Sequence, residues 1–479
     1  MQLKTSPRSL SVKAIVSYII TQVAILLAFP KAAMPFYLYV FGISAVVLFF
    51  SGSHSMSRQW QIYGPKRFER RLFWTAFAIR MAVMLLLFVL NQTLYGTFWS
   101  SDPGDVESYV ELADVGFDKI VYGIGPSGSL FSIWQSWGWD YDDLGYPMYL
   151  TIVRILSFGQ SPYIIPLILK CVWGALTCVF VARLGERHFG PSAGRLAGIF
   201  CALQFNMIWW CASMMKETEM VFMTVLFIDI SDRFVRHRSI NVKQIIALAA
   251  LLIAMYSFRK ALAVVEAVAL GAALVISSKK IVAGWKRVLA FLLIGVVAMT
   301  SVYSIVNDVT AGQSAGDLEA AQKANMEWRT EREDGNKFAK YAGAAVFAPL
   351  IFTIPFPTMT YTFQNQEMLM QVAGGNYVKN VLSVFVILVF LGMLKSGSWR
   401  EHVLPVSFVL GYLAVLVLSQ YAQSGRFHMP VLPFEMMFAA YAVSQLKSGT
   451  VRWFNIALIL EFLACAVWNW FKLAGRGMI

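Results

Sequence analysis

The stretch L-F-W-T-A-F-A-I-R-M-A-V-M-L-L-L-F-V-L-N-Q-T-L-Y, Leu72 to Tyr95, is an apolar run of helical composition. A membrane-crossing helix needs about 20 mainly apolar residues, because the hydrocarbon core is about 30 Å thick. The stretch therefore predicts a span. It is followed by S-D-P-G-D-V-E-S-Y-V-E-L-A-D-V-G, Ser101 to Gly116, which holds five carboxylates and no base. The junction of these two stretches indicates the fold class and a candidate site.

The composition of the whole chain agrees with a membrane protein. Of 479 residues, 58% are hydrophobic and 14% are charged, and the mean hydropathy is +0.60. A soluble domain carries roughly 25% charged residues. We therefore expect one polytopic membrane domain. The cysteines lie in apolar segments without a C-x-x-C pair, which favours small core residues over disulfides or a metal site: Cys171, Cys178, Cys201, Cys211 and Cys465.

Apolar runs recur along the chain and predict an all-α fold of about 13 transmembrane helices. The expected spans are 12–29, 35–51, 72–95, 164–183, 192–212, 218–232, 243–257, 261–277, 286–305, 379–395, 404–419, 429–446 and 453–471. The first is expected to be a retained anchor, because Pro30-Lys31 follows it in place of a cleavage site. We divide the chain into two extra N-terminal helices (1–71), a catalytic membrane domain (72–446) and a C-terminal helix (447–479).

The distribution of Lys and Arg predicts the orientation, because basic loops stay on the cytoplasmic side. Loops such as 58–71 and 233–243 are basic and alternate with others if the N-terminus is inside. The alternation requires that 145–158 and 343–357 do not cross, so we expect both to be re-entrant or interfacial on the outer side. The long loops 97–163 and 306–378 then lie outside. Most of the net charge of +13 comes from these basic cytoplasmic loops. Anionic lipid headgroups are their expected partners, so the charge does not call for a nucleic acid.

Three short outer turns carry cations, against the general trend. They hold Lys216, then Arg259 with Lys260, and finally Arg426 with His428. Cations at membrane depth usually face the protein interior or a wet cavity. Any one of these cations could also extend to the membrane surface and bind lipid phosphates. Three such turns facing one acidic loop favour a functional site.

Cations opposite carboxylates suit a lipid phosphate that carries a transferable group. Arg and Lys bind phosphate oxygens and stabilise the charge that develops on a leaving phosphate. A carboxylate opposite them can take a proton from an incoming hydroxyl. The chain lacks G-x-x-x-x-G-K-[ST] and H-E-x-x-H motifs. A preactivated lipid-linked donor therefore fits better than a nucleotide. The sequence identifies no cofactor with certainty and leaves a divalent cation open, because a carboxylate pair and a phosphate can together hold one.

At this point the sequence resembles the C-type (GT-C) superfamily of membrane glycosyltransferases, and within it the bacterial relatives of protein mannosyltransferases. The resemblance covers roughly 72–446, and its pieces follow in order: the span 72–95, the pattern D-x-x-x-Y-x-x-x-A at Asp105, Tyr109 and Ala113, the stretch G-Y-P-M-Y-L at Gly145–Leu150, the span that ends in Arg183–Gly190, the turn with Lys216-Glu217, and G-R-F-H-M-P-V-L-P at Gly425–Pro433.

The resemblance implies an inverting transfer of a sugar from a polyprenyl-phosphate donor to a glycan, lipid or protein acceptor. The active site would lie on the outer (periplasmic) face of a bacterial inner membrane. The expected base is Asp105, with Asp102 as the second candidate. We expect Lys216, Arg259, Lys260 and Arg426 to bind the donor phosphate. Glu217, Tyr109, Tyr146 and His428 are expected to contact the sugar or acceptor.

Structural roles are the alternative for several of these residues. Asp102 before Pro103 suits a helix N-cap, and Asp105 would then lie in the first turn, where the helix dipole favours a carboxylate. Glu217 is able to pair simply with Lys216 or Arg259. Tyr146 also fits an interfacial aromatic belt.

Two other functions remain open at the level of sequence. One is an O-antigen or capsule polymerase or ligase that uses a diphosphate-linked oligosaccharide. The other is a transporter or flippase of lipid-linked sugars, which would have inverted repeats and a site at the midplane. A single outward cavity lined by Asp105, Lys216, Arg259 and Arg426 would favour the transferase.

Overall fold

The computed structural model describes residues 3–98, 105–136, 143–160, 163–236, 241–277, 336–338, 344–361, 367–419 and 421–479. Every regular element in these ranges is helical. Six helices are long and apolar enough to cross a membrane: α1 (Arg8–Ala28), α2 (Phe36–Gln59), α3 (Pro65–Tyr95), α7 (Ile164–Phe189), α17 (Ala373–Ser396) and α20 (Ser448–Ala474). The chain is therefore an all-helical, multi-pass membrane protein. Thirteen spans are not confirmed, and the expected span 286–305 lies outside the described residues.

The remaining helices are shorter and fall into two groups. Those in the bundle are α8 (Pro191–Leu203), α9 (Phe205–Trp209), α10 (Glu217–Arg236), α11 (Val242–Phe258), α12 (Lys260–Ile276), α18 (Val403–Leu418) and α19 (Leu432–Ser444). The others are α4 (Asp105–Tyr122), α5 (Leu130–Ser136), α6 (Gly145–Leu156), α15 (Ala344–Phe347) and α16 (Glu367–Gln371). Short 3₁₀ turns link several of them: η1 (Pro30–Ala32), η2 (Trp60–Ile62), η3 (Trp210–Ala212), η5 (Ala348–Leu350) and η7 (Ser398–Glu401).

The two segments expected not to cross are short in the structure. α6 has 12 residues and is about 18 Å long, well under the thickness of the hydrocarbon core. α15 has four residues and continues into η5. Neither helix is long enough to span a bilayer.

The expected span 192–212 is interrupted at Gln204, which separates α8 from α9. The last carbonyl groups of a helix have no partner within it. Here Arg80 of α3 supplies donors, with Nη2 3.1 Å from the carbonyl oxygen of Cys201 and Nη1 3.3 Å from that of Ala202. The Gln204 side chain donates to the carbonyl oxygen of Gly375 at 3.1 Å. Protein groups thus satisfy the broken helix, as a membrane interior requires.

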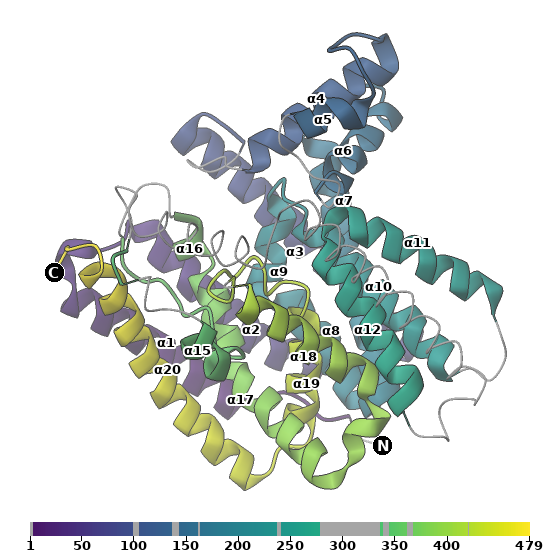
Figure 1. Ribbon diagram of the computed structural model, residues 1–479. Helices are drawn as coiled ribbons and strands as arrows, with labels where there is room; N and C mark the ends of the chain where they lie inside the picture. The colour runs from purple at the N-terminus through teal and green to yellow at the C-terminus, as the bar shows by residue number, and fades with distance from the viewer. Residues whose placement is uncertain are drawn as a thin grey trace.

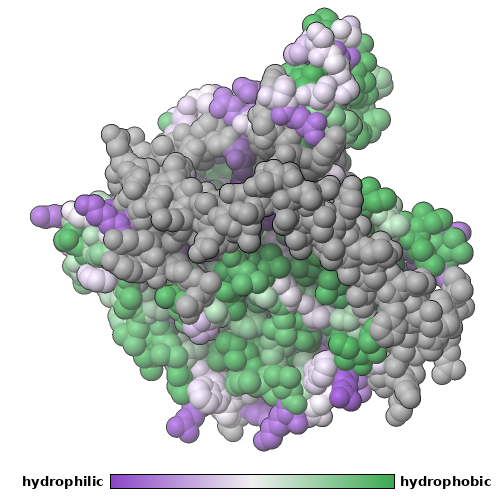
Figure 2. All heavy atoms as spheres, in the orientation of Figure 1, coloured by the Kyte–Doolittle hydropathy of each residue, from purple (hydrophilic) through white to green (hydrophobic). Residues whose placement is uncertain are grey.

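The helices form one bundle with a separate group at one end. α7 packs against α8, α3 and α10, and α19 packs against α8 and α17. Figure 1 shows α4, α5 and α6 projecting above the rest of the bundle. Figure 2 shows an apolar band below them, with hydrophilic residues gathered at the lower edge. The connection from α17 to α18 and the start of α20 lie at that lower edge (Figure 1).

The contact between α2 and α17 depends on a glycine. A Cβ atom added at Gly374 would lie 2.5 Å from the carbonyl oxygen of Gly42 and 2.8 Å from the Cβ atom of Ala45. The obstructing oxygen belongs to the backbone, so the two helices would have to separate. On the same helix, a Cβ atom at Gly392 would meet nothing within 4 Å.

We predict that Gly374→Ala destabilises the protein by about 1–3 kcal/mol, the usual cost of overpacking. Thermal unfolding in detergent should show a lower midpoint for this variant. Gly392→Ala is the matched control and should leave the midpoint unchanged or slightly raised. Equal midpoints for the two variants would contradict the close helix contact.

Candidate functional site

Two carboxylates from distant parts of the chain bind the guanidinium of Arg426. Arg426 lies in the connection between α18 and α19. Its Nη1 is 2.6 Å from Oδ2 of Asp105, and its Nε donates to Oε1 of Glu217. Asp105 is the first residue of α4 and Glu217 the first of α10, where the helix dipole favours a negative charge. Three segments that the sequence singled out therefore meet at one side chain.

The two carboxylates differ in their access to solvent. The Glu217 side chain is fully buried, whereas the Asp105 side chain is 47% exposed. Burial alone would raise the pKa of Glu217, but Arg426, Arg259 and Lys216 more than offset this and hold the pKa below its usual value. Burial likewise disfavours the charged form of Arg426, yet Glu217 and Asp105 raise its pKa above the ordinary range. Glu217 is thus an ionised counter-ion, and Asp105 is the accessible carboxylate.

The other expected phosphate ligands lie around Glu217. Arg259 Nη2 is 3.9 Å from Oε1 of Glu217, and its guanidinium lies 4.4 Å from the ring centroid of Phe427. Its Nη1 donates to the hydroxyl of Tyr412 at 3.4 Å. Lys260, the next residue, is exposed and forms no ion pair among the described residues.

Lys216 is buried and links neighbouring segments. Its Nζ donates to the carbonyl oxygen of Phe258 at 2.7 Å and pairs with Asp143. Its ammonium also lies 5.9 Å from the ring centroid of Tyr109. These contacts hold the end of α11 and the start of α6 against the turn that precedes α10.

The expected sugar contacts Tyr109 and Tyr146 are both buried. Their ring centroids are 5.1 Å apart, edge to face. Next to Tyr146, Lys170 forms an ion pair with Glu219 at 2.6 Å, and its Nζ lies 5.2 Å from the ring centroid of Tyr146. The two rings therefore form a packed tyrosine layer, and among the described residues neither ring is part of the lining of the two cavities at Arg426.

His428 folds the segment that carries Arg426. Its Nδ1 is 3.2 Å from Nζ of Lys379, and its Nε2 is 2.8 Å from the carbonyl oxygen of Ala422. Because an ammonium can only donate, Nδ1 accepts and Nε2–H donates. Burial and the nearby Lys379 hold the pKa of His428 well below its usual range. A neutral His428 thus closes the turn from 422 to 428.

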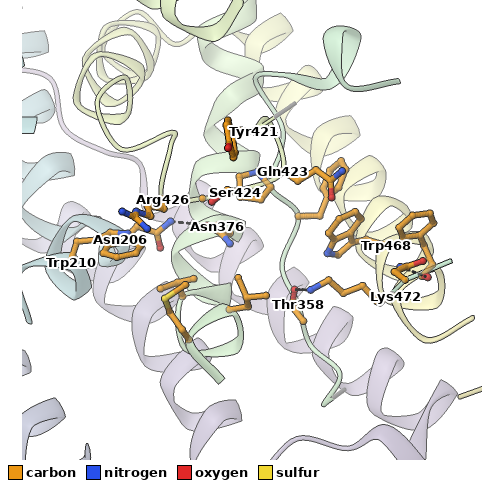
Figure 3. Close-up of a pocket in the computed structure, with 18 of the residues that line it drawn as sticks. Asn206, Trp210, Thr358, Asn376, Tyr421, Gln423, Ser424, Arg426, Trp468 and Lys472 are labelled. Atoms are coloured by element: carbon orange, nitrogen blue, oxygen red, sulfur yellow. Dashed lines mark hydrogen bonds between the residues drawn. The ribbon is translucent and has the colours of Figure 1, made fainter. Parts of the chain in front are cut away.

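Two cavities meet at Arg426. The Asp105 cavity has a volume of about 230 Å³ and is lined by Asp105 and Arg426 together with apolar residues that include Leu87, Phe98 and Leu167. The Lys472 cavity has a volume of about 360 Å³ and is shown in Figure 3. Trp210, Met368 and Arg426 border both.

Of the four residues expected to line one cavity, Asp105 and Arg426 line the Asp105 cavity, and Arg426 also lines the Lys472 cavity. Among the described residues, Lys216 and Arg259 are not part of the lining of either cavity. These two side chains instead point to the carboxylates and carbonyl groups described above. Asp102 lies outside the described residues.

The sequence interpretation missed the cations of the Lys472 cavity. Lys472 and Arg476 both line it, near the C-terminal end of α20. A signal was available: with the N-terminus inside and 13 spans, the end of the last span would be on the outer side. Basic residues there oppose the positive-inside trend, as in the three short turns. Among the described residues, no group of three or more His, Cys, Asp or Glu side chains is placed to hold a metal ion.

Comparison with known proteins gives little further guidance. No protein family model matches the chain, and no curated protein matches it. Among solved structures, the fold is similar to the oligosaccharyltransferase of Archaeoglobus fulgidus in complex with zinc and sulfate, with 11% sequence identity and a TM-score of 0.36. The match covers 84% of this chain and 52% of that protein, so the chain spans about half its length.

We predict that acid destabilises the protein through His428. Because its pKa is lowered in the folded state, the unfolded chain binds the proton more readily, and stability falls as the pH drops below the unfolded value of about 6.5. The unfolding midpoint should therefore fall between pH 7.5 and pH 5.5, and less steeply for His428→Gln. Equal slopes for the two proteins would show that His428 protonation is not linked to unfolding.

Proposed function

We propose that the protein is a membrane glycosyltransferase that moves a sugar from a polyprenyl-phosphate donor to an acceptor at the outer (periplasmic) face of a bacterial inner membrane. The observation that carries the proposal is the position of Arg426. It is permanently charged, is held by Asp105 and Glu217, and borders two adjacent cavities. A guanidinium beside a solvent-accessible carboxylate supports this proposal, because an arginine is able to bind phosphate oxygens.

The proposed reaction uses Asp105 as the general base. The carboxylate takes the proton of an acceptor hydroxyl, whose oxygen bonds to the anomeric carbon as the bond from that carbon to the phosphate oxygen breaks. The electron pair leaves with the lipid phosphate. Arg426 stabilises the charge that develops there, because an arginine fork matches phosphate oxygens. Attack opposite the leaving group inverts the anomeric centre.

Glu217 is proposed to assist from the buried side. Its Oε1 binds Arg426, while its Oε2 has no hydrogen-bond donor among the described residues. A buried oxygen without a donor is costly, and a sugar hydroxyl would supply one. Arg426, Arg259 and Lys216 together keep this carboxylate ionised. The apolar wall of the Asp105 cavity, which includes Leu87 and Leu167, suits the first isoprene units of the donor.

One alternative shares these residues. A polymerase or ligase with a diphosphate-linked oligosaccharide would also use Asp105 and Arg426, and it would need more positive charge for a second phosphate. Lys472 and Arg476 line the neighbouring cavity. If they bind the same substrate as Arg426, they supply this additional charge and favour the alternative.

We predict that Asp105→Asn reduces sugar transfer by roughly 10²- to 10⁴-fold, the usual contribution of a general base. The assay is release of sugar from short-chain polyprenyl-phosphate hexoses and pentoses by the purified protein. Glu107→Gln, an exposed carboxylate in the same helix turn, is the matched control and should retain activity. If Asp105→Asn remained fully active, Asp105 would not be the base, and Asp102→Asn would be assayed next.

Mass spectrometry of lipid that co-purifies with the protein tests the donor class. A polyprenyl-phosphate sugar is expected, whereas a diphosphate oligosaccharide would favour the polymerase or ligase. Arg426→Lys keeps the charge but loses the fork that binds two groups at once. We expect roughly 10-fold less bound lipid in this variant and no change in Arg452→Lys, an exposed cation on α20. Lipid retained at the wild-type level would contradict a phosphate at Arg426.

A further inference from the structure

Most cations near Arg426 are already matched by carboxylates. Lys216 pairs with Asp143, and Arg426 with Asp105 and Glu217. Arg259 faces the same Glu217. A substrate with a second anionic group would therefore find little unbalanced positive charge in this cluster.

Lys472 differs from these cations. Its side chain is only 7% exposed, yet it has no carboxylate partner among the described residues. Its Nζ donates one hydrogen bond, to Oγ1 of Thr358 at 2.9 Å, and lies 5.5 Å from the ring centroid of Trp468. An ammonium has three donors, so further donors remain for a ligand. A buried charge without a counter-ion is costly, and a bound anion would remove that cost.

The surroundings of Lys472 suit a sugar. Trp210 and Trp468 provide aromatic faces, and Asn376 and Ser424 provide hydrogen-bonding groups. The indole Nε1 of Trp468 is buried and has no acceptor among the described residues. No Asp or Glu of the described residues lines the cavity, and its volume of about 360 Å³ lies in the range of small-ligand sites.

We propose that the Lys472 cavity is a second phosphate subsite, in which Lys472 and Thr358 bind a phosphate group of the substrate and Trp468 contacts the adjoining sugar. Figure 3 shows Arg426 and Lys472 at opposite ends of this cavity. A substrate that lies between them presents one anionic group to each. The proposal rests on the proposed function. It limits the substrates to pairs of donor and acceptor that carry two phosphate groups between them.

Such a phosphate has two sources, a diphosphate-linked donor or a phosphorylated acceptor sugar. Binding to the purified full-length protein in detergent distinguishes them, with farnesyl monophosphate, farnesyl diphosphate, glucose 6-phosphate and glucose as probes. Lys472→Met removes the charge and keeps an unbranched apolar side chain in the helix. Arg452→Met is the matched control, because Arg452 is an exposed cation on the same helix.

We expect Lys472→Met to lower the binding affinity for at least one phosphorylated probe by about 10-fold or more, and Arg452→Met to bind every probe with the wild-type affinity. Selective loss for farnesyl diphosphate over the monophosphate identifies the donor as the source. Selective loss for glucose 6-phosphate over glucose identifies the acceptor. The proposal is overturned if the affinity for every phosphorylated probe is unchanged, or if the affinity for glucose falls by the same factor.

The test separates this proposal from the proposed function. If Asp105→Asn abolishes transfer while Lys472→Met binds every probe as the wild type does, only the second subsite is refuted. If no sugar is transferred from any polyprenyl donor while phosphate binding still depends on Lys472, the transferase proposal fails and the anion site stands.

Discussion

The ion pairs of Arg426 with Asp105 and Glu217 are the interaction on which the site depends. They join the start of α4, the start of α10 and the connection before α19. An arginine fork binds two carboxylates in fixed directions, which a lysine cannot do. The position of Asp105 relative to the cavities is therefore set by one guanidinium that is itself held in the turn closed by His428.

The same principle governs the interior of the bundle. Charges at membrane depth are stable only when protein groups surround them. Arg80 binds the carbonyl groups at the end of α8, and Lys170 pairs with Glu219 beside the tyrosine layer. The contacts of these two buried cations therefore explain their structural roles. Lys472 stands apart, because its contacts among the described residues are a hydroxyl and an aromatic ring.

The sequence predicted the helical membrane class because hydrophobic length is a strong signal. It also predicted that Lys216, Arg259 and Arg426 face one acidic outer loop, since their shared departure from the positive-inside trend is visible without a structure; that they surround Glu217 was not predicted. It did not reveal the break at Gln204, because apolar residues continue on both sides of it. The roles of Lys216 and Lys472 were not readable either, since their partners Asp143 and Thr358 are distant in sequence. The choice between Asp105 and Asp102 stays a prediction.

The pair of Asp105 and Arg426 has a consequence for the course of a reaction cycle. If Asp105 is the base, it loses its charge at the moment when the acceptor attacks. The Coulomb attraction to Arg426 then weakens, while the departing lipid phosphate offers Arg426 a new anionic partner. α4 stays packed on α6, and its Tyr109 remains in the core beside Tyr146. The proton that Asp105 accepts would therefore transfer Arg426 from one anionic partner to another without requiring the helix to move.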